Sequence, residues 1–262
     1  MHRLLSAVWF SLRLHHFLGL ILALTILPTF AAGLGVAPTL LEFTPQEVAK
    51  GLTLRNSGTT ALRAQVRIFR WQQQNGKDVL APSAALVASP PFLNIAPGGR
   101  QMVRIIQRGG IAPDTLAGER SFRILVDELP APPVDETGVN SLAGAQPGLN
   151  FLLRFSVPVF IASPLDGAGA KLSWRLQHTE AGLQLVTDNT GGSRAQITDL
   201  KLMSSEGRVL YEHKGLAGYV LSGNSRLWPF SLPSRVATAT EIRMQVNGQP
   251  TRHPLSPADI TD

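Results

Sequence analysis

Apolar and polar residues alternate at every second position along much of the chain beyond residue 33, and helical periodicity is nearly absent. The alternation is clear at residues 64–71, 101–107 and 122–126, and it is the pattern of strands that bury one face. Turn-forming residues such as Asn56-Ser57-Gly58 separate these runs at spacings of about 8–12 residues, as in a β-sandwich. We therefore predict an all-β fold.

The strand pattern resumes after Ser163-Pro164-Leu165-Asp166-Gly167, which we interpret as a short hinge. The chain thus predicts two β-sandwich domains, at residues 33–162 and 165–262, and no repeat of identical residues relates them. In the second domain, strands are expected at residues 171–176, 183–187, 197–203, 209–212, 226–230 and 241–246.

The first 32 residues have the order of a secretory signal peptide. Arg3 and Arg13 precede an apolar stretch at residues 17–27, and Pro28 and two small residues, Ala31 and Ala32, follow it. The alternative is a membrane anchor, but an apolar stretch of eleven residues is short of the roughly 20 that span a bilayer. We expect cleavage near Ala31 or Ala32 and export without membrane insertion of the mature chain. An exported chain with no cysteine fits a bacterial periplasm.

The run at residues 149–160 follows a Pro/Gly-rich loop of about twenty residues, a length that is usually functional in a compact domain. Leu149, Phe151, Leu153 and Phe155 share one face of this run. They could line the core of their own sandwich. However, Leu152 on the opposite face is also apolar, so the run has apolar groups on both sides.

The residues that catalysis or metal binding would need are missing or scattered. Cysteine is absent, and His178, His213 and His253 are far apart in the sequence. Asp127 and Glu128 are adjacent, so they point to opposite faces of a strand and cannot flank one scissile bond. The net charge of +6 includes no dense Lys/Arg run, which disfavours nucleic acid as a partner. We expect no catalytic residue, no metal site and no cofactor.

Five segments together resemble a known family, the PapD-like periplasmic chaperones of the chaperone–usher pilus pathway. The matching segments are residues 54–71, 89–105, 120–130 and 149–164, with a looser match at residues 218–228. Residues 154–160 (RFSVPVF) are closest to the archaic branch, which is associated with spore-coat-protein-U-type subunits.

The resemblance implies two immunoglobulin-like domains and a non-enzymatic chaperone for pilus or spore-coat-like subunits. Such subunits are incomplete immunoglobulin folds, and the chaperone completes them with its own edge strand before an outer-membrane usher receives them. On this basis the donor strand consists of Leu149, Phe151, Leu153 and Phe155.

The resemblance fails at one position pair. In typical members an Arg and a Lys hold the C-terminal carboxylate of the subunit, but Leu40 and Pro158 occupy those places here. Arg154 and Arg104 are our candidates for the anchor, because an Arg fork fits a carboxylate. The alternative for Arg104 is a structural ion pair with Asp127 or Glu128.

Two other functions compete with the chaperone. A fibre subunit would carry an alternating N-terminal extension and one incomplete domain, whereas this chain predicts two complete domains. An exported carbohydrate-active β-sandwich enzyme would need convergent acids in a cleft, which the carboxylates do not supply.

Overall fold

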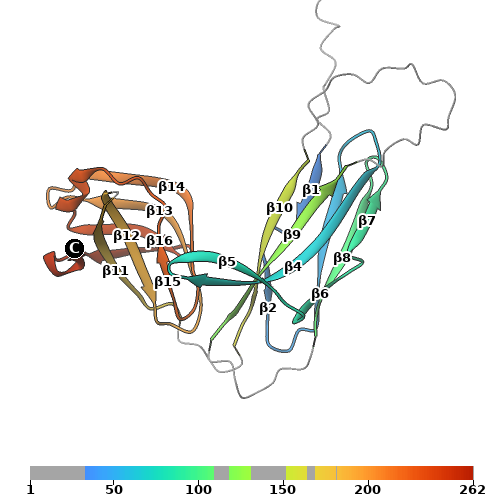
Figure 1. Cartoon of the computed structure of the whole chain (residues 1–262), viewed down its shortest axis with the longest axis horizontal. Helices are drawn as coiled ribbons and strands as arrows, with labels where there is room; N and C mark the ends of the chain where they lie inside the picture. Colours follow the sequence, from blue (N-terminus) through green and yellow to red (C-terminus); the bar gives the residue numbers. More distant parts are fainter. Residues whose placement is uncertain (1–32, 109–117, 131–151, 164–168, 181, 262) are drawn as a thin grey trace, which may run out of the picture.

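The computed structural model describes residues 33–108, 118–130, 152–163, 169–180 and 182–261. The expected signal peptide, most of the Pro/Gly-rich loop, Leu149, Phe151 and most of the expected hinge lie outside these residues. The fold is all-β, and Figure 1 shows two lobes joined at an angle. The prediction of an all-β protein with two sandwich domains is therefore confirmed.

The N-terminal lobe is a sandwich of two sheets. One sheet has the strand order β1-β3-β8-β6, and the other has the order β2-β10-β9-β4-β5, with β7 paired to β4. Residues from both inner faces, including Leu52, Ile105 and Ile124, form one buried core. The strands are β1 (Leu34–Ala37), β2 (Leu41–Phe43), β3 (Ala49–Asn56), β4 (Leu62–Gln74), β5 (Lys77–Pro82), β6 (Leu86–Ser89), β7 (Phe92–Ile95), β8 (Arg100–Gln107), β9 (Arg120–Leu129) and β10 (Arg154–Ile161).

The C-terminal lobe pairs a sheet of order β15-β12-β11-β18 with one of order β14-β13-β16-β17. Its separate core contains Trp174 and Trp228, whose stacked rings have centroids 6.0 Å apart. The strands are β11 (Leu172–Thr179), β12 (Gly182–Asn189), β13 (Ala195–Met203), β14 (Val209–Val220), β15 (Asn224–Leu227), β16 (Glu241–Val246), β17 (Gln249–Pro254) and β18 (Ile260–Thr261), with the short 3-10 helices η1 (Ser234–Thr238) and η2 (Pro257–Asp259).

Several of the expected strands have different limits in the structure. The strand expected at residues 209–212, for example, is β14 and continues to Val220. The strand expected at residues 226–230 is Asn224–Leu227, because Trp228 turns into the core and packs there. The strand expected to begin at Leu149 is described from Arg154, and Leu152 and Leu153 precede it without strand pairing.

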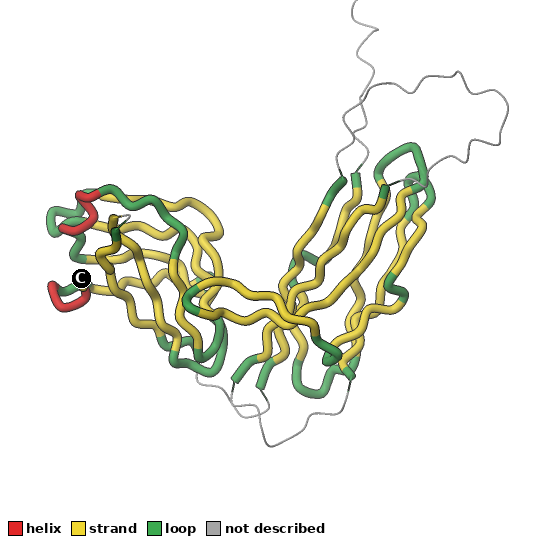
Figure 2. The backbone as a smooth tube through the Cα atoms, viewed as in Figure 1, coloured by secondary structure: helices red, strands yellow, loops and turns green. Residues whose placement is uncertain are grey.

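The β4–β5 hairpin joins the two lobes. Its tip, Asn75-Gly76, has positive φ at both residues (49° and 73°), as a two-residue hairpin turn requires. The carbonyl of Gly76 accepts a hydrogen bond from Leu227 N in the other lobe, at 2.8 Å. A Cβ on Gly76 would lie 2.3 Å from the Leu227 side chain, so glycine is needed for this contact. Figure 2 shows the hairpin reaching from one sandwich to the other.

An aromatic cluster next to the hairpin contains residues from both lobes. Trp71, Phe160 and Tyr219 pack with ring centroids 5.5–5.9 Å apart, and Tyr219 comes from the C-terminal lobe. Gln73 donates to the Tyr219 carbonyl at 2.8 Å and accepts from Leu221 N at 3.0 Å. These buried contacts fix the angle between the lobes.

Candidate functional site

Strand β10 has an open edge along its first half. On one side it pairs with β9 over its whole length, from Arg154 to Ile161. On the other side its pairing with β2 begins only at Val159. Among the described residues, Arg154 to Pro158 therefore have no partner strand on that side. Their backbone groups can take another strand by β-augmentation.

The core-facing residues of β10 become more exposed toward this open end. Val159 is fully buried and Val157 is 4% exposed, whereas Phe155 and Leu153 are half-buried. Leu153 and Phe155 still pack against the N-terminal core, as does Val36 on the edge strand β1. The apolar core thus reaches the surface at the end of the sandwich where β10 is unpaired. Leu152 is 53% exposed, so the segment is not sealed on both flanks.

Arg154 lies at the open end, where it shares a carboxylate with a second arginine. Asp127 forms ion pairs with Arg154 and, at 2.7 Å, with Arg67. Desolvation raises the pKa of Asp127, but the hydrogen bonds from Arg67 and Arg154 outweigh it and hold the pKa below its ordinary value. Since the Arg154 side chain remains 64% exposed, part of its guanidinium is available to a further carboxylate.

Arg104 lies elsewhere. It is on β8, in the sheet opposite to the one that contains β10, and its side chain is exposed on the outer face. Neither Asp127 nor Glu128 is its partner, because Asp127 pairs with Arg67 and Arg154 and the Glu128 carboxylate accepts from Leu153 N. The structure therefore does not bring the two predicted anchor residues together.

A cleft of about 440 Å³ lies between the two lobes. Leu40 and Pro158, the residues at the usual basic positions, both line it. Two arginines also line it: Arg123 from β9 and Arg226 from β15. Arg226 forms an ion pair with Asp78 at 2.5 Å, so its charge is already matched.

Arg123 was not singled out from the sequence. It stands directly opposite Pro158 in the β9–β10 register. Its guanidinium lies 3.8 Å from the centroid of the Trp71 ring and 5.9 Å from that of Tyr219. Burial lowers its pKa, and within the described residues no carboxylate forms an ion pair with it. The alternation of Phe122, Ile124 and Val126 does place Arg123 on the opposite face. It does not show that this face lines a cleft.

Within the residues that the structure describes, His, Cys, Asp and Glu side chains form no group of three or more that could hold a metal ion. None of the described helices has the length and apolarity to cross a bilayer.

Residues 33–164 match the sequence profile of a family described as pili and flagellar-assembly chaperone, PapD N-terminal domain. No curated protein sequence matches the chain. The fold is similar to one in the pre-assembly complex of CsuC with the tip adhesion subunit CsuE, from archaic chaperone-usher Csu pili of Acinetobacter baumannii. The TM-score is 0.64 at 22% identity, over 88% of this chain and 99% of that chain.

Two further solved structures share the fold. The Salmonella enterica complex of SafA pilin with the SafB chaperone gives a TM-score of 0.57 at 15% identity, covering 87% of this chain and 98% of that one. The Escherichia coli chaperone DraB gives 0.54 at 17%, covering 86% and 96%.

Proposed function

The chain belongs to the PapD-type pili and flagellar-assembly chaperones, a periplasmic and non-enzymatic family, and we propose that it captures incomplete immunoglobulin-like pilus subunits by donor-strand complementation. It then delivers them to an outer-membrane usher. Its predicted signal peptide takes it to the periplasm. The observation that carries the proposal is the open edge at Arg154–Pro158, where the apolar core reaches the surface.

The donor strand consists of Leu149, Phe151, Leu153 and Phe155. Leu153 and Phe155 support this assignment, because both are half-buried apolar residues at the mouth of the core, beside an unpaired edge. A subunit strand hydrogen-bonded to that edge would bring its own apolar groove over these side chains. Burying each of them fully contributes roughly 1.5–3 kcal/mol.

The test is co-purification of the chaperone with its subunit. Leu153→Asp, alone or with Phe151→Asp, should leave the chaperone folded and weaken capture by about tenfold or more, because a charge replaces buried apolar area. Leu152→Asp is the matched control, since Leu152 is the neighbouring apolar residue and belongs to the opposite face. Normal capture by the Leu153→Asp variant would exclude this donor strand.

The carboxylate anchor has three candidates, Arg154, Arg104 and Arg123. We favour Arg123 as the principal anchor and Arg154 as a second one. Arg123 is a half-buried cation that is attracted by Asp78 but forms no ion pair with a described carboxylate. It is the cross-strand neighbour of Pro158, so it can replace the missing basic side chain from the adjacent strand. Arg104 lies on the opposite sheet, and this position argues against it as the anchor.

The anchor test compares arginine variants against a subunit whose C-terminal carboxylate is either free or amidated. Arg123→Gln should weaken capture of the free-carboxylate subunit by about tenfold, the value of a charged hydrogen bond, and should not affect the amidated one. Arg154→Ala should weaken capture more than Arg67→Ala. If Arg123→Gln weakens both subunits alike, Arg123 acts through packing on Trp71 and is not the anchor.

A further inference from the structure

The outer face of the β1-β3-β8-β6 sheet carries three exposed arginines. Arg100 and Arg104 are on β8, and Arg55 is on β3 directly opposite Arg100. Met102 lies between the two β8 arginines and is 62% exposed. No side chain stands opposite Arg104 on β3, because Gly51 occupies that position and the Met102 sulfur covers it.

Among the residues that the structure describes, these arginines have no anionic partner. The four strands of this sheet contain no Asp or Glu, and within the described residues none of the three side chains takes part in an ion pair. Arg55 and Arg100 are like charges at directly opposite positions, an arrangement that destabilises a sheet. The face therefore concentrates positive charge that no carboxylate of the described segments neutralises.

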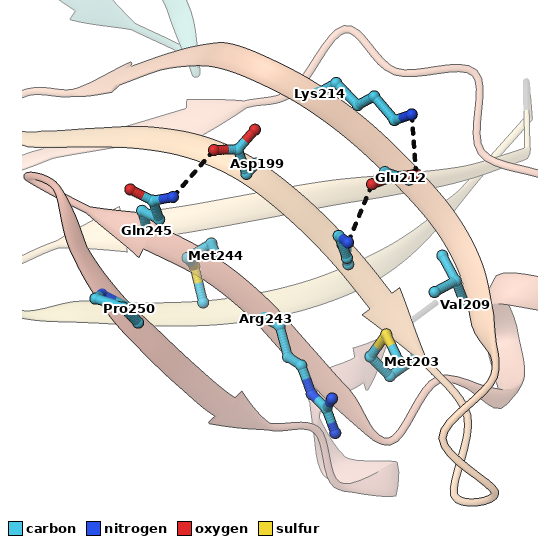
Figure 3. Close-up of a pocket in the computed structure, with 10 residues that line it drawn as sticks. Asp199, Met203, Val209, Glu212, Lys214, Arg243, Met244, Gln245 and Pro250 are labelled. Atoms are coloured by element: carbon cyan, nitrogen blue, oxygen red, sulfur yellow. Dashed lines mark hydrogen bonds and ion pairs between the residues drawn. The ribbon is translucent and has the colours of Figure 1, made fainter.

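The corresponding face of the C-terminal lobe is arranged differently. On the β14-β13-β16-β17 sheet, Glu212 forms ion pairs with Lys201 at 3.1 Å and with Lys214 at 4.0 Å. Asp199 accepts a hydrogen bond from Gln245 at 3.1 Å. Figure 3 shows these pairs side by side over the sheet. Arg243 and Arg252 lie opposite each other on that face too, but its strands also carry carboxylates beside the cations, whereas the sheet with Arg55, Arg100 and Arg104 carries none.

We propose that the outer face around Arg55, Arg100 and Arg104 docks an acidic segment of a partner protein, separately from the open edge of β10. Arginine forks pair with carboxylates in a bidentate way, and all three cations are arginines. Arg100 and Arg104 are four residues apart on one strand, about 13 Å at the usual rise per residue. A partner strand laid on this face would match them with two carboxylates that flank an apolar residue at alternate positions. The apolar residue would contact Met102.

The experiment uses the whole chaperone and a synthetic peptide in which Asp, Leu and Asp occupy alternate positions. Binding is measured by fluorescence anisotropy at low and high salt, beside the same peptide with Asn in place of Asp. We expect the Asp peptide to bind and the Asn peptide not to bind. The Arg100→Glu/Arg104→Glu variant should bind the Asp peptide about tenfold more weakly or worse, since two charge-assisted contacts become repulsive.

The matched control is Arg208→Glu/Arg252→Glu, at two exposed arginines of the C-terminal lobe, which makes the same change in net charge without touching this face. Equal weakening by this control would reduce the effect to overall charge and overturn the proposal. Unchanged binding by the Arg100→Glu/Arg104→Glu variant would do the same. So would stronger binding to vesicles of anionic phospholipid than to the peptide, because the ligand would then be a membrane surface. The Arg100→Glu/Arg104→Glu variant should still capture the pilus subunit normally, which keeps this test independent of the donor strand.

Discussion

Each lobe has a buried asparagine that holds its two sheets together, but the two lobes differ in which groups they leave available at the surface. In the N-terminal lobe, Asn56 is 1% exposed; its amide donates to the carbonyls of Thr60 and Ile95, and its carbonyl accepts from Gly58 N. In the C-terminal lobe, Asn189, also 1% exposed, donates to Ser193 and Val220 and accepts from Gly191 N. Each Asn is the last residue of a strand, and its side chain hydrogen-bonds to the opposite sheet. We call these two strand ends the asparagine corners.

The difference lies at the surface. The N-terminal lobe has an unpaired stretch of β10 with half-buried apolar side chains, and a sheet face with unmatched arginines. The outer face of the C-terminal lobe carries carboxylates beside its cations, as in the pair of Glu212 with Lys201, and this lobe contributes Tyr219 and Arg226 to the cleft. The shared corners stabilise the fold, whereas the groups available to partners are concentrated in the N-terminal lobe.

The largest expected effect on stability comes from the corners. Asn56→Ala leaves the Thr60 and Ile95 carbonyls and Gly58 N without their partner, and we expect a loss of about 3 kcal/mol in the free energy of unfolding. Asn189→Ala should cause a similar loss in the other lobe. Native-state hydrogen exchange followed by mass spectrometry assigns each loss to its lobe. If either variant opens both lobes to the same extent, the interface makes them one cooperative unit and the two corners are not independent.

The corners also show what the sequence could and could not predict. From the sequence we interpret Asn56-Ser57-Gly58 as a turn, and Asn189-Thr190-Gly191 has the same Asn and Gly turn formers at the same spacing. The sequence does not show that the two turns are structurally equivalent, because the matching hydrogen bonds reach Ile95 and Val220, which are far away in the sequence. The alternation at residues 64–71, 101–107 and 122–126 gave the strands, because burial on one face leaves a local pattern.

The candidate site was only partly predictable, for a related reason. The apolar stripe that includes Leu153 and Phe155 follows from period-two spacing along one strand. Arg123 required the register of β9 against β10 and the position of Trp71 on a third strand. The position of Arg104 in the sheet that does not contain β10 could not be predicted either, because the sequence does not tell which of two sheets a basic strand joins.

A smaller effect should appear in acid. The pKa of Asp127 is lowered in the folded protein, so its ionised form contributes stability above the unfolded pKa of about 3.9 and loses it as the pH falls through the folded pKa. Asp127→Asn should cost about 1 kcal/mol at neutral pH through weaker hydrogen bonds to Arg67 and Arg154. It should also flatten the fall of stability below pH about 4.

Glu241 provides the comparison in the C-terminal lobe. The hydrogen bond from Arg243 lowers its pKa as well, but this carboxylate is far more accessible to water than Asp127. Glu241→Gln should therefore change the acid limb of a urea-denaturation series less than Asp127→Asn does. A larger change for Glu241→Gln would mean that exposure to water does not decide how much each of these two carboxylates contributes to stability.

The smallest expected effect is the most direct test of the difference between the outer faces. Arg100→Glu places a carboxylate opposite Arg55 and should raise stability by about 0.5 kcal/mol, since an opposite-charge pair replaces a like-charge pair. Glu212→Lys does the reverse in the other lobe, because it sets a second cation opposite Lys201 and should lower stability by a similar amount. Thermal unfolding at low and high salt measures both shifts, and salt should shrink both. If Arg100→Glu instead lowers the melting temperature, the arginines of the N-terminal face already stabilise the fold, and the face has no surplus charge to offer a partner.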